Sequence, residues 1–99
     1  MTKRVILKGD VSAGSDGHQP TPAIEGNEYF TVDGKPVVTV GCKYQDHRKL
    51  PDGDWHVDRY QSEGSSRIFV NGVEVAVSGD KISCGDTAGT GTGFNVDSN

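Results

Sequence analysis

The chain has 99 residues, of which 14 are glycine and only 32% are hydrophobic, and its formal net charge is −4. This length suits one domain with a modest core, so we expect residues 1–99 to form a single domain without an extension domain. The acidic balance and the scattered lysines and arginines argue against nucleic-acid binding, which needs clustered positive charge. The apolar run at residues 5–7 is too short for a signal peptide or a membrane span, which predicts synthesis in the cytoplasm without export by that route.

Short β-branched runs set the expected secondary structure. Val-Ile-Leu at 5–7, Val-Val-Thr-Val at 37–40 and Ile-Phe-Val at 68–70 are each bounded by glycine, aspartate or asparagine. Such runs are typical of strands, and no stretch of about ten residues carries the apolar periodicity of a helix. The sequence therefore predicts an all-β protein.

An internal repeat organises the middle of the chain. EGNEYFTVDGKPVVTVGCK at 25–43 aligns without a gap to EGSSRIFVNGVEVAVSGDK at 63–81, at a constant offset of 38 residues. Each copy has a β-branched run on either side of Asp33-Gly34 or Asn71-Gly72. These dipeptides favour a two-residue hairpin turn, because both central residues take a positive φ. Each copy is therefore predicted to form a β-hairpin.

Two partial copies flank this pair. Residues 5–10 match the second half of the unit, with Gly9-Asp10 corresponding to Gly79-Asp80, and residues 94–98 match the start of a hairpin. The third unit is thus divided between the two chain ends, and we expect the N-terminal strand to pair with the C-terminal one. Such closure removes exposed strand edges. The sequence predicts a small domain of three pseudo-threefold β-hairpin repeats.

Irregular loops are expected after the three units, at 11–24, 44–62 and 81–92. They contain all the histidines of the chain, His18, His47 and His56, and one of its two cysteines, Cys84. Pseudo-threefold packing would bring the loops together at one end. Three imidazoles and one thiolate form a closed tetrahedral set for zinc, or alternatively for iron. One such ion per chain would stabilise a domain whose core is small.

Other roles are open to these residues. Cys84 alone would also suit a buried hydrophobe, a nucleophile or half of a disulfide with Cys42, although a chain without a signal peptide favours reduced thiols. A catalytic zinc would need an open position, whereas a fourth protein ligand is available and no glutamate adjoins a histidine as a base. The Gly-Thr segment at 89–93 lacks the lysine of a phosphate-binding loop and is more typical of a flexible turn. We therefore expect no enzymatic activity.

In combination, the motifs resemble those of PAAR-repeat proteins. The resemblance is carried by Glu-Gly before each hairpin, the hairpins of the form (Ile/Phe)-(Phe/Thr)-Val-(Asn/Asp)-Gly, the sequence GDKISCG at 79–85 and the histidines between units. It extends from about residue 5 to the end of the chain. The chain departs from the pattern in lacking the Pro-Ala-Ala-Arg tetrapeptide and in having Cys42 where an aspartate is expected after Gly41.

The resemblance implies a small, cone-shaped PAAR-like domain that caps the trimeric β-helical spike of a contractile injection machine and sharpens it for piercing the target cell envelope. A metal ion near the apex, zinc or iron, would be held by His18, His47, His56 and Cys84. The chain is similar to spike-tip proteins of T-even-type contractile-tailed phages. A type VI secretion tip is the alternative, and a free-standing small metal-binding or sugar-binding β module is a further one.

The resemblance also implies the partners. The chain would be a monomer by itself, present as one copy per spike at the virion tail baseplate, with the trimeric spike as its partner, transient contact with the target membrane and no nucleic acid. Val5, Leu7, Val38 and Ile68 are candidates for the protein's own core, which we favour, or for the surface that covers the spike.

Overall fold

The computed structural model describes residues 2–14, 20–48, 55–56 and 59–97, with only the backbone of Thr2, His47, Arg48, Trp55, His56 and Asp97. Its strands are β1 (Thr2–Arg4), β2 (Asn27–Val32), β3 (Lys35–Val37), β4 (His47–Arg48), β5 (Trp55–His56), β6 (Phe69–Val70), β7 (Val73–Glu74) and β8 (Asn95–Asp97). No helix occurs in the described ranges, which confirms the all-β prediction. The same ranges therefore hold no helix that is long and apolar enough to cross a membrane.

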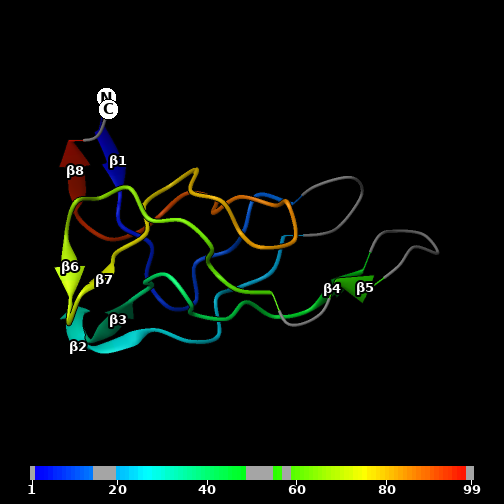
Figure 1. Cartoon of the computed structure of the whole chain (residues 1–99), viewed down its shortest axis with the longest axis horizontal. Helices are drawn as coiled ribbons and strands as arrows, with labels where there is room; N and C mark the ends of the chain where they lie inside the picture. The colour runs from blue at the N-terminus through cyan, green and yellow to red at the C-terminus, as the bar shows by residue number, and fades with distance from the viewer. Residues whose placement is uncertain (1, 15–19, 49–54, 57–58, 98–99) are drawn as a thin grey trace.

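Three antiparallel strand pairs gather at one end of the molecule, termed here the hairpin end (Figure 1). They are formed by β2 with β3, β6 with β7, and β1 with β8. Asp33 and Gly34 have φ angles of 52° and 82°, and Asn71 and Gly72 have 51° and 83°, so both tips adopt the predicted positive φ. The β1–β8 pair confirms that the two chain ends close the divided unit.

A triangular ring of extended segments joins the three units. The segments are 5–7, 37–39 and 75–77, and each pairs with the next around a pseudo-threefold axis. The bridging pairs are Leu7–Val37, Thr39–Val75 and Val77–Val5. The central residues of the segments form a closed cycle of backbone hydrogen bonds: the N–H of Ile6 donates to the Ala76 carbonyl, that of Ala76 to the Val38 carbonyl and that of Val38 to the Ile6 carbonyl. The predicted threefold repeat is therefore a closed ring in space.

A second ring is formed where the three loops follow these segments. Its antiparallel bridges are Val11–Pro22, Ala23–Tyr44, Lys43–Tyr60, Gln61–Ile82, Lys81–Thr87 and Ala88–Ser12. The loops thus meet one another in cyclic order, and the end of the molecule beyond this ring is termed the loop end. Figure 1 shows β4 and β5 at this end, opposite the three hairpins.

The glycine-rich segment at 89–93 packs closely on the first strand run. A Cβ atom on Gly91 would lie 2.5 Å from the carbonyl oxygen of Val5 and 2.6 Å from that of Arg4. Gly93 N–H donates to the Val5 carbonyl at 2.9 Å. The segment was expected to be a flexible turn; its glycines instead permit a close backbone approach that any side chain would prevent.

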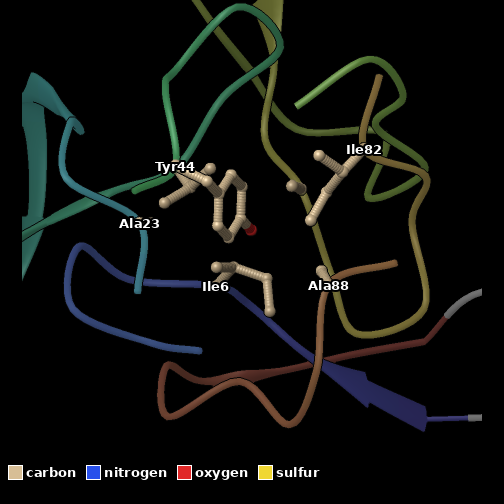
Figure 2. Packing of buried hydrophobic residues seen from close by; sticks show 7 residues of the cluster. Ile6, Ala23, Tyr44, Ile82 and Ala88 are labelled. Atoms are coloured by element: carbon tan, nitrogen blue, oxygen red, sulfur yellow. The ribbon is translucent and has the colours of Figure 1, made fainter. Parts of the chain in front are cut away.

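The ring separates two apolar clusters, because successive side chains of an extended segment point to opposite sides. The cluster toward the hairpins contains Val5, Leu7, Val37, Val75, Val77 and Val96, with Phe30, Val32, Ile68 and Val70 packed against it and partly exposed. The cluster toward the loops contains Ile6, Ala23, Val38, Tyr44, Ala76, Ile82 and Ala88 (Figure 2). Val5, Leu7 and Val38 are buried and belong to the protein's own core, as favoured from the sequence, whereas Ile68 is half-buried at the hairpin end.

Candidate functional site

Side chains from all three loops surround the guanidinium group of Arg59. Arg59 is 0% exposed, and its Nε donates a hydrogen bond to Cys84 Sγ at 3.2 Å. One terminal nitrogen donates to the Asp86 carboxylate at 2.9 Å. The other donates to the Gln45 carbonyl at 2.7 Å and to the Thr21 hydroxyl. A single buried cation therefore links loops that are far apart in the sequence.

The repeat explains why these residues meet. Thr21, Arg59 and Asp86 occupy equivalent places in the three loops. The backbone carbonyl of each accepts the N–H of the residue five positions after the ring segment of its unit. The donor residues are Ser12, Tyr44 and Ile82, at 2.8, 2.9 and 2.9 Å respectively. Three equivalent positions around a pseudo-threefold axis thus carry a hydroxyl, a guanidinium and a carboxylate, which complement one another.

The sequence prediction did not include this triad. One signal was present, because the 38-residue offset, carried four residues upstream of Glu25 and Glu63, pairs Thr21 with Arg59. No identity marks that pair, and the third loop has a different length, so Asp86 falls outside the gapless alignment. Its equivalence is visible only in the backbone hydrogen bonds.

Tyr44 connects the triad to the apolar cluster at the loop end. Its ring lies across the middle of that cluster (Figure 2), and Arg59 Cζ is 5.7 Å from the ring centroid. Its hydroxyl donates to Gln61 Oε1 at 2.9 Å. Burial raises the pKa of the Tyr44 phenol, and the nearby Arg59 charge opposes this only in part. Tyr44 therefore stays neutral and acts as a hydrogen-bond donor at neutral pH.

The four predicted metal ligands are described to different extents. Cys84 lies in the third loop with its thiol on Arg59. The second loop was expected to be irregular but contains the β4–β5 hairpin, whose register places His47 directly opposite His56. His18 lies outside the described residues.

Among the residues with described side chains, no three His, Cys, Asp or Glu are grouped to hold a metal ion, and all three histidine side chains fall outside that set. The chain on either side of the β4–β5 pair carries Gln45 and Arg59, and these two hydrogen-bond to each other. Arg59 also contacts Cys84, so the residues that flank the β4–β5 pair in the chain lie beside the Cys84 thiol. Thiolate and imidazole groups, as in cysteine and histidine, are both ligands that zinc accepts.

Cys42 occupies a turn rather than this region. Its Sγ accepts the Thr39 N–H at 3.5 Å, whereas the carboxylates of Asp10 and Asp80 accept the equivalent N–H groups at 2.8 and 2.9 Å. Cys42 and Cys84 are both thiols and form no disulfide. Cys42 therefore replaces a turn-forming aspartate, as its place in the repeat indicates.

Comparison with known families identifies the class of the protein. The family model for the PAAR motif matches residues 9–89, which is most of the chain. The chain therefore belongs to the PAAR-motif family, as its strand-rich fold also indicates. No curated protein matches the chain.

PAAR-motif proteins are structural tip proteins of contractile injection systems, not enzymes, and they bind a spike protein in those systems. The particular chain described here is thereby placed among spike-tip proteins.

Proposed function

We propose that this chain is the tip protein of a contractile phage tail spike. Its hairpin end would cap a trimeric β-helical spike protein, and its loop end would form a metal-stabilised apex that pierces the target envelope. The resemblance described from the sequence supports the phage machine over a type VI secretion system. In a phage the protein would reside at the virion tail baseplate.

One observation carries the proposed docking surface. Each of the three hairpins presents an apolar residue at the same position, Phe30, Ile68 or Phe94, and a valine two residues later. Phe94 is 38% exposed, and its ring stacks on that of Phe30 with centroids 5.9 Å apart. These three apolar contacts are equivalent in position but not identical in residue type, and their arrangement around a pseudo-threefold axis suits the open end of a threefold partner. The partner could also add its strands to the edges of the hairpins.

Binding to a purified trimeric spike protein of the same machine tests this proposal. We expect one copy of the chain per trimer by light scattering. Phe94→Asp should weaken the affinity at least tenfold, because it places a charge in an apolar contact. Tyr60→Asp is the matched control, because Tyr60 is also exposed but lies in the second ring. Equal binding by both variants would rule out the hairpin end as the docking surface.

The proposed apex uses the donor set found in the sequence. His18, His47, His56 and Cys84 would hold one zinc or iron ion, which would cross-link the three loops without taking part in catalysis. We expect about one metal ion per chain by elemental analysis, with the metal lost or weakened in His47→Ala and Cys84→Ser. Cys42→Ser should retain it. Metal that survives Cys84→Ser but not Cys42→Ser would contradict this ligand set.

The choice of machine has a separate test. Mass spectrometry of purified virions should detect the chain at the stoichiometry of a tail tip. Its absence from virions, together with its export by a contraction-dependent secretion system, would favour the type VI alternative.

A further inference from the structure

We propose that Arg59 is the positioning residue of the loop end: it fixes the Cys84 thiol and ties the three loops together before any metal ion binds. The functional meaning of this inference rests on the proposed metal centre. Its structural content rests on the contacts of Arg59, which are complete without a metal.

The geometry requires an arginine rather than any cation. The guanidinium group carries five N–H donors in a rigid planar fork. Nε donates to Cys84 Sγ, and the terminal nitrogens donate to one partner in the same loop and to three partners in the other two loops. Those partners are Asp86 at 2.9 Å, Ser12 Oγ at 3.4 Å, the Gln45 carbonyl at 2.7 Å and the Thr21 hydroxyl. A lysine carries three donors on one nitrogen, so it cannot reproduce this planar set of contacts.

Charge balance makes the arrangement stable in the interior. Both side chains of the Arg59–Asp86 ion pair are 0% exposed, and a buried charge is tolerated only when it is paired and hydrogen-bonded. Asp86 Oδ1 accepts the Thr87 N–H at 2.7 Å, so the carboxylate is itself held in place. The Asp86 carboxylate thereby holds the guanidinium group in place, and the guanidinium group can in turn hold the Cys84 thiol.

A cysteine thiol that is already held in one rotamer is expected to bind a metal ion more tightly than a thiol that is free to rotate. A cysteine side chain otherwise samples several χ1 rotamers, and each must be restricted when a metal binds. Groups that orient a metal ligand typically alter metal affinity by about 10–100-fold. Arg59 would therefore preorganise the one thiol ligand of the proposed site.

The decisive test uses the metal-free, chelator-treated protein. We expect χ1 coupling constants measured by NMR to show a single Cys84 rotamer in the wild type and rotamer averaging in Arg59→Met and Arg59→Lys. Arg59→Lys retains the charge beside Asp86, so it keeps the test valid if Arg59→Met fails to fold. Arg67→Met is the control, because Arg67 is exposed, and it should leave the rotamer unchanged. A single Cys84 rotamer in Arg59→Lys would overturn the proposal.

Cobalt binding separates this inference from the metal centre itself. We expect Arg59→Lys to bind cobalt about 10–100-fold more weakly than the wild type, with an altered thiolate-to-cobalt absorption band. Wild-type affinity and an unchanged band in Arg59→Lys would also overturn the positioning role. If the wild type takes up no cobalt and no zinc, the metal centre is wrong, and the NMR comparison still decides whether Arg59 positions Cys84.

Discussion

At the scale of single residues, the same turn occurs once in each unit, but the side chain that accepts its backbone N–H is a carboxylate in two units and a thiol in the third. Gly9, Gly41 and Gly79 have φ angles of 97°, 96° and 89°, and the next residue accepts the N–H of the residue three positions earlier. Asp10 and Asp80 do so with carboxylates at 2.8 and 2.9 Å, and Cys42 with sulfur at 3.5 Å. Because sulfur is a weak acceptor, this turn is the least stabilised of the three.

Cys42→Asp should therefore stabilise the protein. A carboxylate acceptor for the Thr39 N–H is expected to add about 1 kcal/mol to the free energy of unfolding at neutral pH, which raises the melting temperature by about 4–8 °C in a domain of this size. Differential scanning calorimetry measures the change. The reciprocal variant Asp80→Cys should lower the melting temperature, and a lower value for Cys42→Asp would show that its sulfur is held by packing instead.

At the scale of elements, the segment before β8 is fixed by close backbone contact. Gly89 and Gly91 each have a backbone oxygen 2.5 Å from the position that a Cβ would take. The Arg4 side chain also binds this segment, because it donates hydrogen bonds to the carbonyl oxygens of Gly93 and Thr92 at 2.8 and 3.0 Å. The segment therefore sets the position of β8 against β1.

Gly91→Ala should be considerably more damaging than a substitution in a hairpin tip. We expect it to cost about 3 kcal/mol or more, because the backbone of residues 4–5 must move to admit the new methyl group. Gly34→Ala is the comparison: Gly34 has a positive φ but open space around it, so the cost should be about 1 kcal/mol. Urea unfolding of the two variants measures both values, and equal losses would mean that the contact at Gly91 relaxes easily.

At the scale of the whole molecule, the three units are related by the pseudo-threefold axis. Two of them have a hairpin turn at the place where the third has its two separate strand ends, in β1 and β8. Thr2 of β1 pairs with Asp97 of β8 at the hairpin end (Figure 1), where the other two units have the turns Asp33-Gly34 and Asn71-Gly72. One bridge of the first ring joins each pair of units, at 5–77, 7–37 and 39–75, so each unit makes the same kind of contact with its two neighbours. The fold should therefore tolerate chain termini placed in one of the other two hairpin turns.

A circular permutant tests this symmetry. Asp97 would be joined to Thr2 through an Asn-Gly turn, and new ends would be opened between Asp33 and Gly34. We expect a folded monomer whose melting temperature lies within about 5 °C of the wild type, because each hairpin and each bridge is retained. A permutant opened between Gly91 and Thr92 is the control and should fold poorly. Failure of the first permutant would show that the three units are not interchangeable.

The sequence by itself determined the features that depend on local chemistry. Asp33-Gly34 and Asn71-Gly72 require positive φ, and the 38-residue offset requires the hairpins to be equivalent, so the all-β class, the hairpins and the closure of the two ends could all be predicted. The candidate ligands were assigned by the same repeat. The structure brings their loops together but leaves the histidine side chains undescribed, so the metal set stays a prediction.

Only the tertiary structure decided the burial and the contacts of Arg59. An arginine in a polar loop is ordinarily exposed, and nothing within a few residues of Arg59 indicates that it is buried. Its partners Ser12 and Cys84 lie 47 and 25 residues away in the chain. They reach it because three unlike loops close around one pseudo-threefold axis, and the burial of a charge depends on that closure as a whole.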